Sequence, residues 1–405
     1  MWAHDAWAIR RNGPQVSGSR APTPAADATK VTRFRAPATL PAQQATPPER
    51  RMPVPRLAPP ARLPRDARIY VAGHRGLVGS AIWRLLCADG YSDLLGRTSA
   101  ELDLRDRRAA FAFFAAERPT AVILAAAKVG GIMANSSLPA DFLSDNLLIS
   151  LNVLDAAQAS GVQRVLFLGS SCIYPKYAPQ PIPESALLTG PLEPTNDAYA
   201  IAKIAGVLHV QALRRQYGAS FISAMPTNLY GPGDNFDLQT SHVLPALIRR
   251  LHEAKQAGAD SVTLWGTGTP RREFLHVDDL ARACLFLLEH YDDPEPINVG
   301  VGADLSIREL AELVADVVGY RGQLVWDASH PDGTPRKLLD VSRLNDLGWQ
   351  AEIDLTAGVR ATYDWYVEHR QLTPVRPAPL PAVDPAKPAR RRPGSRLEPP
   401  ATRTR

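Results

Sequence analysis

The chain has 405 residues, 45% of them hydrophobic, which is enough to bury a large core in one to three domains. Its formal net charge of +5 is concentrated at the ends, because residues 1–65 carry 11 Lys/Arg against 3 Asp/Glu and residues 371–405 carry 8 against 2. The ends thus hold +8 and +6 and the middle holds −9, which argues against a core that binds nucleic acid.

Both ends are also rich in proline, with 12 of the 37 prolines in residues 1–65 and 9 in residues 371–405. Neither end has sustained apolar periodicity, so neither can bury enough surface to offset the entropy of ordering, and we expect two disordered tails. The basic run Arg390–Arg392 is compatible with RNA, membrane or protein binding, but a solvated tail is the simpler interpretation. The Arg- and Ala-rich N-terminus resembles an organelle transit peptide, and an upstream extension before a start near Met52 fits equally well.

The sequence contains no apolar run close to the roughly 20 residues that span a bilayer, and its N-terminus lacks the pattern of a secretory signal. Its cysteines, Cys87, Cys172 and Cys284, are too few and too scattered for a disulfide framework or a zinc site. We therefore expect a cytoplasmic protein with no membrane span and no metal.

From residue 68 the pattern becomes that of an alternating α/β fold. Residues 68–72 predict a short strand, residues 80–88 have helical apolar spacing, and the turn Gly73-His74-Arg75-Gly76-Leu77-Val78-Gly79 joins them. In such a turn the first glycine permits the bend, the second lets the backbone approach a pyrophosphate, and the third lets the helix pack closely on the strand. The pattern predicts a dinucleotide site, although glycine turns also follow strands for structural reasons alone.

A second strand at 93–95 leads to the position where a dinucleotide domain distinguishes NAD from NADP. Arg97 stands there in place of an acid, which favours NADP, and Arg75 in the glycine turn is within reach of the same phosphate. A helix at 106–116 and a strand at 121–124 complete another repeat, and this alternation implies a parallel sheet.

The next strand, 163–168, ends in Gly169-Ser170-Ser171-Cys172, after a small-residue loop at 125–131 and a long helix that ends near Ala159. Ligands bind beyond the carboxyl ends of such strands, so we expect a substrate beside these side chains. Tyr199 and Lys203 then lie four residues apart on one face of a helix. We expect the ammonium to lower the pKa of the phenol and make it a proton donor or acceptor.

Beyond the strand at 220–225 the alternation loosens, which indicates a smaller domain built from later segments. We expect a Rossmann-type doubly wound parallel sheet mainly within residues 66–235, and a C-terminal α/β substrate domain mainly within 236–370, with interleaved segments. His242 precedes a helix predicted at 243–251, and further helices are predicted near 278–290, 306–318 and 356–368. The Trp265 ring is suited to stacking on a base, nearby arginines are suited to phosphate, and a polar loop at 331–337 is placed to close over a nucleotide sugar.

Residues 68–370 together resemble the extended short-chain dehydrogenases/reductases and, among them, the GDP-L-fucose synthase family. The motifs that carry the resemblance are Ala72–Gly76, Ala127–Ile132, Gly169–Pro175, Tyr199–Lys203, Pro226–Pro232, Arg272–Asp279 and Asp332–Lys337. The resemblance implies conversion of GDP-4-keto-6-deoxy-D-mannose to GDP-L-fucose, by epimerisation at C3 and C5 and NADPH reduction at C4. It also implies a homodimer.

The resemblance implies a role for each matching position. Cys172 and His242 match the acid/base pair of the epimerisation, and Tyr199, Lys203 and Ser170 match the group that performs the reduction. The cofactor positions are Gly73, His74, Arg75, Gly76, Leu77, Val78, Gly79, Arg97, Ser99, Leu168, Gly169, Ser170, Ser171, Lys203, Pro226, Thr227, Asn228, Leu229 and His242. The GDP-sugar positions are Arg250, Trp265, Arg272, Asp332 and Lys337. Some family members have a basic residue where Ser99 stands, so recognition of the 2′-phosphate would rest on Arg75 and Arg97.

Two other functions remain open at this point. One is a nucleotide-sugar epimerase or dehydratase that retains NAD and consumes no net reductant. The other is a non-catalytic protein that senses a dinucleotide or binds through its tails, which predicts a broken Tyr/Lys motif.

Overall fold

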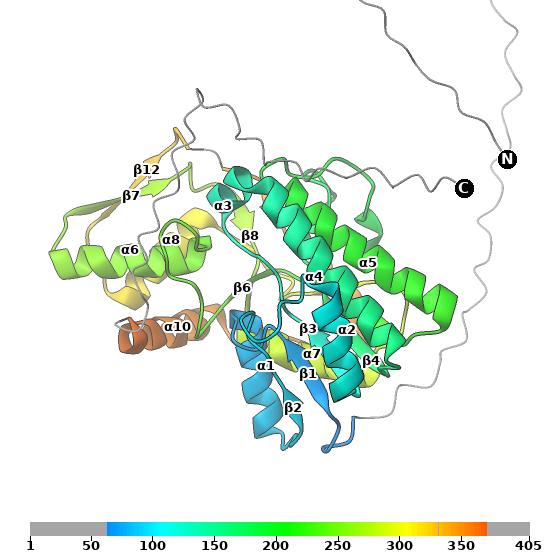
Figure 1. The fold of residues 1–405 in the computed structure, drawn as a ribbon. Helices are drawn as coiled ribbons and strands as arrows, with labels where there is room; N and C mark the ends of the chain where they lie inside the picture. The colour runs from blue at the N-terminus through cyan, green and yellow to red at the C-terminus, as the bar shows by residue number, and fades with distance from the viewer. Residues whose placement is uncertain (1–62, 331, 371–405) are drawn as a thin grey trace, which may run out of the picture. The chain divides into compact units, whose positions relative to one another are not determined.

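The computed structural model describes residues 63–330 and 332–370. The predicted tails lie outside these residues except for positions 63–65, where Leu63 is already buried in the core with 6% of its surface exposed. The fold is α/β, as expected, with a parallel six-stranded sheet and a smaller region formed by later segments (Figure 1).

The large sheet has the strand order β10-β5-β4-β3-β1-β2, and every neighbouring pair is parallel. Its strands are β1 (Ile69–Ala72), β2 (Leu94–Leu95), β3 (Ala121–Leu124), β4 (Arg164–Leu168), β5 (Phe221–Pro226) and β10 (Ile297–Val299). The chain passes from β1 to β2 on one side and then returns to β3 on the other side. This reversal places a ligand crevice at the carboxyl ends of β1 and β3.

Alternate residues of these strands face two separate cores. Tyr70 and Phe167 pack with α2 (Arg107–Glu117), α4 (Pro139–Ala159) and α5 (Asp197–Tyr217). Ile69 and Leu166 pack with α1 (Leu77–Ala88), α7 (Val277–His290) and α9 (Ser342–Asp346). Both faces of the sheet are therefore covered, which explains why its strands read as continuous apolar runs.

Two helix boundaries differ from the sequence-based expectation. Helix α1 begins at Leu77, three residues before the predicted 80, so Gly79 already lies in its first turn. Helix α6 runs from Val243 to Ala257, beyond the predicted end at 251, and stops at Gly258, whose φ of +63° suits glycine. The last turns of α6 are polar, so the apolar pattern alone ended too early.

The smaller region is built from segments that leave the large sheet after β5 and again after β10. Helices α6, α8 (Ile307–Val318) and α10 (Leu355–His369) share a third core with a parallel pair, β7 (Ser261–Trp265) and β12 (Gln323–Asp327). A three-stranded sheet joins β8 (Arg271–Arg272) to β11 (Leu305–Ser306) and β13 (Arg336–Lys337), and β6 (Asn228–Tyr230) pairs with β9 (Phe274–His276). Short helices α3 (Ile132–Ser137), η1 (Ser171–Ile173) and η2 (Glu184–Ala186) lie in the connecting loops.

A fully buried carboxylate, Glu273, connects the two regions. Its Oε1 accepts from the backbone N–H groups of Val301 (2.6 Å) and Gly302 (2.7 Å), and its Oε2 accepts from that of Leu339 (3.0 Å). Burial raises the pKa of Glu273, and the three backbone donors oppose that rise. The carboxylate thus holds the loop after β10 and the loop after β13 against the segment between β8 and β9.

We expect Glu273→Ala to lower the free energy of unfolding by about 3 kcal/mol, because three buried amides lose a charged acceptor. Glu273→Gln keeps the shape but presents an amide donor to one of those amides, so we expect an intermediate loss. Urea unfolding checks both values. Glu312→Ala, at an exposed position of α8, is the matched control and should stay within about 0.5 kcal/mol of the parent protein. A loss for Glu273→Ala no larger than for this control would contradict the clamp.

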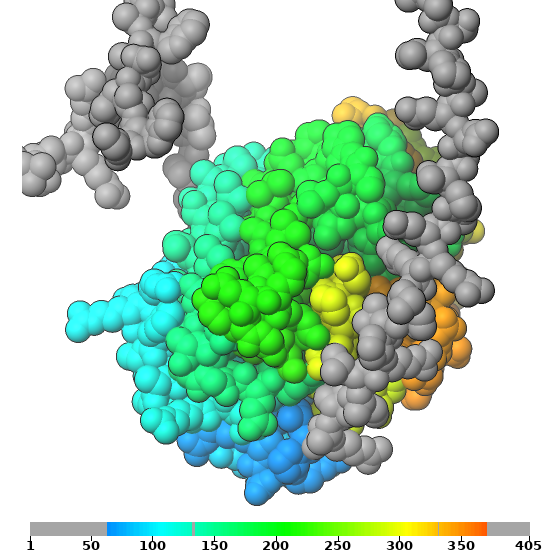
Figure 2. All heavy atoms as spheres, turned by 90° about the vertical axis from the view of Figure 1, so that its right-hand side faces the viewer, coloured from blue at the N-terminus to red at the C-terminus, as the bar shows by residue number. Residues whose placement is uncertain are grey.

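Helix α5, coloured green, forms much of the face shown in Figure 2. Exposed apolar side chains on α4 and α5 include Leu148, Ile201 and Leu208, which are 43%, 46% and 41% exposed. In residues 63–330 and 332–370, no helix combines the length and apolar character that a membrane crossing requires.

Candidate functional site

Two positions of the turn after β1 accept only glycine. Gly73 has a φ of +84°, and a Cβ there would lie 2.9 Å from the backbone of Ala126. A Cβ on Gly79 would lie 2.1 Å from the carbonyl oxygen of Gly73. Gly76 caps α1 without a side chain, so the first-turn amides face outward and are suited to an anion. The turn therefore fits the pyrophosphate of a dinucleotide.

The two arginines expected near an adenosine phosphate differ in their surroundings. Arg75 is exposed at the tip of the turn, whereas Arg97 donates to Glu117 Oε1 (2.8 Å) and to the Gly96 carbonyl (2.9 Å). Ser99 is exposed. His74 packs against Trp83 and fills the space where Gly96 lacks a side chain. Arg75 is thus the arginine whose guanidinium is available at this end.

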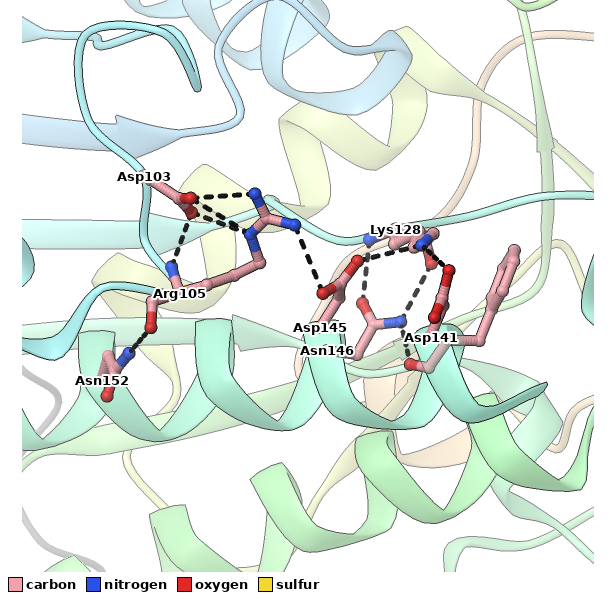
Figure 3. Close-up of polar contacts among 8 residues, drawn as sticks. Asp103, Arg105, Lys128, Asp141, Asp145, Asn146 and Asn152 are labelled. Atoms are coloured by element: carbon pink, nitrogen blue, oxygen red, sulfur yellow. Dashed lines mark hydrogen bonds and ion pairs between the residues drawn. The ribbon is translucent and has the colours of Figure 1, made fainter. Parts of the chain in front are cut away.

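The loop after β3 is held by α4, as Figure 3 shows. The side-chain amide of Asn146 accepts from the backbone N–H of Lys128 (2.9 Å) and donates to its carbonyl (3.0 Å). The Lys128 ammonium pairs with Asp145 (3.0 Å) and Asp141 (3.3 Å), and Arg105 also reaches Asp145. The loop is therefore fixed beside the glycine turn, where the sequence placed it beneath a cofactor.

Ser170 and Cys172 follow β4, and the backbone N–H of Cys172 donates to Ser170 Oγ (3.2 Å). The Cys172 sulfur also accepts from the side-chain amide of Asn196 (3.3 Å) and from the Lys337 ammonium (3.6 Å). Burial opposes ionisation of this thiol, but Lys337, Ser170 and Arg272 outweigh it, so the pKa of Cys172 falls below its ordinary value. The environment is that of a reactive cysteine, unlike buried Cys284, whose pKa burial raises.

Tyr199 and Lys203 lie on one face of α5, beneath the end of β4. Burial raises the pKa of Tyr199, the Cys172 charge raises it further, and a hydrogen bond with Ser170 opposes the rise. Lys203 is 3% exposed, burial lowers its pKa to about 8, and its ammonium donates to the Leu168 carbonyl (2.8 Å). The expected lowering of the phenol pKa is wrong for the protein alone, because the ammonium lies 5.8 Å from the Tyr199 ring and points to Leu168.

His242 stands at the start of α6, and its side chain makes no capping hydrogen bond. The preceding segment is held against the loop after β3, since the backbone N–H of Gly131 donates to the Thr240 carbonyl (3.1 Å). The ring is exposed at its edge, yet the surrounding protein lowers the pKa of His242, and the Lys337 charge lowers it further. The Lys337 charge thus acts on both His242 and Cys172.

Several expected cofactor positions line the ends of β4 and β5. Gly169 packs on Met225, where a Cβ would clash, and Ser171 is buried in η1. After Pro226, the Thr227 backbone N–H donates to the Val299 carbonyl (3.0 Å) and the Asn228 amide donates to the Glu273 carbonyl (2.7 Å). Leu229 follows in β6. These contacts fix the backbone beyond the sheet edge.

The expected GDP-sugar residues fall into two groups. The Trp265 ring stacks on His330 (centroids 4.4 Å apart, 16° between planes), and the Arg250 guanidinium lies 5.3 Å from its centre. Asp332 accepts from the backbone and hydroxyl of Thr267 (2.8 Å each), so it closes the turn after β7. Arg272 and Lys337 are partners across the parallel β8–β13 pair, beside Cys172. The structure thus places Lys337 at the reactive sulfur.

Sequence reasoning missed two polar residues at this site. Asn196 contacts the Cys172 sulfur, but an Asn before a helix resembles an ordinary cap. Glu193 pairs with Lys176 (3.0 Å) and accepts from Thr334 (3.4 Å), which ties the loop at 175–194 to the loop before β13. Only contacts distant in sequence reveal either role. No group of three or more His, Cys, Asp or Glu able to hold a metal occurs in the part of the chain that the structure describes.

The side chains of Ser170, Cys172 and Tyr199 therefore converge, with Lys337 and His242 nearby. A thiol with a lowered pKa can remove a proton, and two hydroxyls can donate to a neighbouring oxygen. Such a set can perform proton transfer next to a carbonyl and can protonate the oxygen of a carbonyl that is being reduced.

Comparison with known proteins gives consistent matches over the described core. Residues 69–300 match the NAD dependent epimerase/dehydratase family. The chain is 61% identical over 306 residues to "Probable GDP-L-fucose synthase 1" of Oryza sativa subsp. japonica, covering 75% of this chain and 93% of that protein. It is 56% identical over 312 residues to the GDP-L-fucose synthase of Escherichia coli (strain K12), covering 75% of this chain and 97% of the relative.

A solved structure is also similar to this chain in fold and sequence. The crystal structure of a GDP-L-fucose synthetase from Naegleria fowleri bound to NADP has a TM-score of 0.72 and 31% sequence identity to this chain, covering 77% of this chain and 96% of that one.

Proposed function

The chain belongs to the GDP-L-fucose synthases of the NAD dependent epimerase/dehydratase family, and we propose that it converts GDP-4-keto-6-deoxy-D-mannose to GDP-L-fucose with NADPH. The observation that supports this most directly is the Cys172 sulfur, held by Lys337 beside Ser170 and Tyr199. A plain C4 reductase needs the two hydroxyls but has no use for an ionisable thiol next to them.

The first stage is epimerisation at the carbons on either side of the C4 ketone. A base takes the proton from C3 or C5, the electron pair moves onto the C4 oxygen, and an acid returns a proton to the opposite face. Cys172 and His242 fill these roles: the Cys172 thiolate, which the lowered pKa of Cys172 favours, takes the proton, and His242 in its protonated form returns one. The Ser170 and Tyr199 hydroxyls donate to the C4 oxygen as its charge develops.

The second stage is reduction at C4. The cofactor is NADP(H), which supplies the hydride when bound. Tyr199 keeps its proton at neutral pH because its pKa is raised, so it is a hydroxyl donor, and it gives that proton to the C4 oxygen. Lys203, held on the Leu168 carbonyl, places a positive charge beneath the site, which stabilises the phenolate that forms.

The glycine turn, the loop at 125–131 and the ends of β4 and β5 hold the cofactor. We place its pyrophosphate on the first turn of α1 and its 2′-phosphate at Arg75. Arg250 and Trp265 hold the GDP end of the sugar nucleotide, and Arg272 and Lys337 lie where the sugar approaches Cys172.

We expect Arg75→Ala to raise the KM for NADPH about tenfold and to leave the KM for NADH nearly unchanged, because one charge-assisted contact to the phosphate is lost. Arg97→Ala is the matched comparison, and its effect should be smaller, since Arg97 is already paired with Glu117. Steady-state kinetics with both cofactors measure this. A larger selectivity change in Arg97→Ala would transfer the role to Arg97.

The direct test of the function is NADPH consumption, followed at 340 nm, with a panel of nucleotide keto sugars. We expect oxidation with GDP-4-keto-6-deoxy-mannose and formation of GDP-fucose. Absence of NADPH oxidation with that substrate would overturn the assignment. Isomerisation without consumption would instead identify an enzyme that retains its cofactor.

We also propose a homodimer, a cytoplasmic location, and two domains with interleaved segments, one mainly within residues 66–235 and the other mainly within 236–370. The dimer is supported by Leu148, Ile201 and Leu208, which are exposed apolar side chains on α4 and α5. These two helices lie side by side (Figure 1). A reducing compartment is supported by Cys87, Cys172 and Cys284, all of which are free thiols. The domain division is supported by the third core, which is formed almost wholly by residues after 235.

A further inference from the structure

Asn196 occupies the N-cap of α5 but does not cap the helix. Asparagine at this position usually accepts from a backbone N–H of the first turn, yet here the side chain makes no such bond. Its amide Nδ2 instead donates to the Cys172 sulfur at 3.3 Å. The opposite end of the amide, Oδ1, is shielded from solvent and has no hydrogen-bond partner among the described residues. The Asn196 side chain thus bonds to the sulfur and leaves the first turn of α5 without a side-chain cap.

Asn196 shares one face of α5 with Tyr199 and Lys203, at spacings of three and four residues. The helix therefore presents Asn196 to Cys172, and one turn later it presents Tyr199 to Ser170. Besides Ser170, the groups that act on the sulfur come from different elements: Lys337 from β13 and Arg272 from β8. Both are cations, which can only donate, so they favour the thiolate.

In the proposed function, on which this inference rests, the sulfur alternates between two states. The thiolate takes a proton from the carbon next to the C4 ketone and becomes a thiol, while the electron pair of that C–H bond moves onto the C4 oxygen. A thiolate accepts hydrogen bonds, whereas a thiol also donates one. An amide can serve both states, because its NH₂ donates to S⁻ and its carbonyl, after the amide turns over, accepts from S–H.

We propose that Asn196 is a positioning residue for Cys172, which keeps the sulfur in place in both of its protonation states. The Oδ1 atom, which has no partner among the described residues, is then the acceptor for the S–H group of the thiol. This role concerns the epimerisation alone, since the hydroxyls of Ser170 and Tyr199 carry the reduction.

The test measures ionisation of the thiol directly. In a Cys87→Ser background, which removes the exposed thiol, the rate of alkylation of Cys172 by iodoacetamide is followed against pH. We expect its midpoint to rise by about one pH unit in Asn196→Ala, because a hydrogen bond to a charged group is lost. The rise should be larger in Asn196→Asp, which replaces the donor by a negative charge. Asp197→Asn is the control, since Asp197 lies in the same first turn and, among the described residues, its side chain accepts a hydrogen bond only from the Ala198 backbone N–H.

A second measurement separates positioning from folding. We expect exchange of solvent deuterium into C3 and C5 to fall about tenfold at pH 7 in Asn196→Ala, with a profile shifted to higher pH. Oxidation of GDP-L-fucose by NADP⁺, the reverse of the reduction, should change by less than about threefold. NADPH fluorescence titration confirms that the variants still bind cofactor.

The outcomes are distinct. An unchanged alkylation midpoint in both variants overturns the proposal, and so does an equal loss of exchange and of GDP-L-fucose oxidation, which would indicate only a disturbed helix start. The parent protein could fail to act on the keto sugar while the alkylation midpoint still shifts in the Asn196 variants. That result would confirm the contact between Asn196 and Cys172 and overturn the proposed reaction.

Discussion

Tyr199→Phe is expected to lower the rate of NADPH oxidation about a thousandfold, with little change in the binding of NADPH. The substitution removes one oxygen, and with it the group that protonates the C4 oxygen as the hydride arrives; positioned acids of this kind contribute about 10²- to 10⁴-fold. Because burial raises the pKa of Tyr199, the phenol is fully protonated at neutral pH, so its loss removes a donor that was always present.

Deuterium exchange at C3 and C5 should respond far less to Tyr199→Phe. Cys172 is intact and Ser170 still donates to the C4 oxygen, so we expect about a tenfold decrease, the effect of one lost hydrogen bond. Tyr217→Phe, an exposed position at the other end of α5, is the matched control and should behave like the parent protein. If NADPH oxidation survived in Tyr199→Phe, Tyr199 would not be the proton donor.

Cys172→Ser should have the opposite signature. We expect exchange at C3 and C5 to fall at least a thousandfold, because a serine hydroxyl cannot form the anion that a thiol with a lowered pKa provides. Oxidation of GDP-L-fucose by NADP⁺ should persist within about tenfold, since it depends on Tyr199, Lys203 and Ser170. Mass spectrometry of the recovered sugar nucleotide gives the exchange, and absorbance at 340 nm gives the oxidation.

The pH dependence gives an independent check on Cys172. With the Cys172 thiolate as the proposed base, exchange in the parent protein should increase with pH and level off above the thiol pKa, which lies below the ordinary value for cysteine. Cys87→Ser, at an exposed thiol, should not change this profile. Exchange that continued at the parent rate in Cys172→Ser would show that another group removes the proton.

Local patterns predicted the parts of this site that lie within single elements. The glycine turn was identified because three glycines in seven residues leave few alternatives, and Tyr199 and Lys203 were identified because four residues make one helical turn. The turn indeed lies at the reversal of strand order, and its glycines face backbone that a Cβ would strike. The sheet was predictable for the same reason, since each buried strand is a short apolar run.

Contacts between distant segments were not predictable in this way. Lys337 and Cys172 are 165 residues apart, and only the pairing of β13 with β8 brings the ammonium to the sulfur. Asn196 was hidden because a cap and a sulfur contact use the same residue type. The effect of Lys203 on Tyr199 was misjudged because spacing gives proximity but not direction, and the Leu168 carbonyl competes for the ammonium.

The Glu273 clamp restricts how this molecule can move. One carboxylate fastens the loop after the last strand of the large sheet and the loop after β13 to the same short segment. A closing movement of the smaller region over a substrate therefore cannot open a gap at Glu273 and must turn about it. Lys337, only two residues before Leu339, lies next to that pivot and would travel little. The ammonium would then stay beside the Cys172 sulfur whether the site is open or closed.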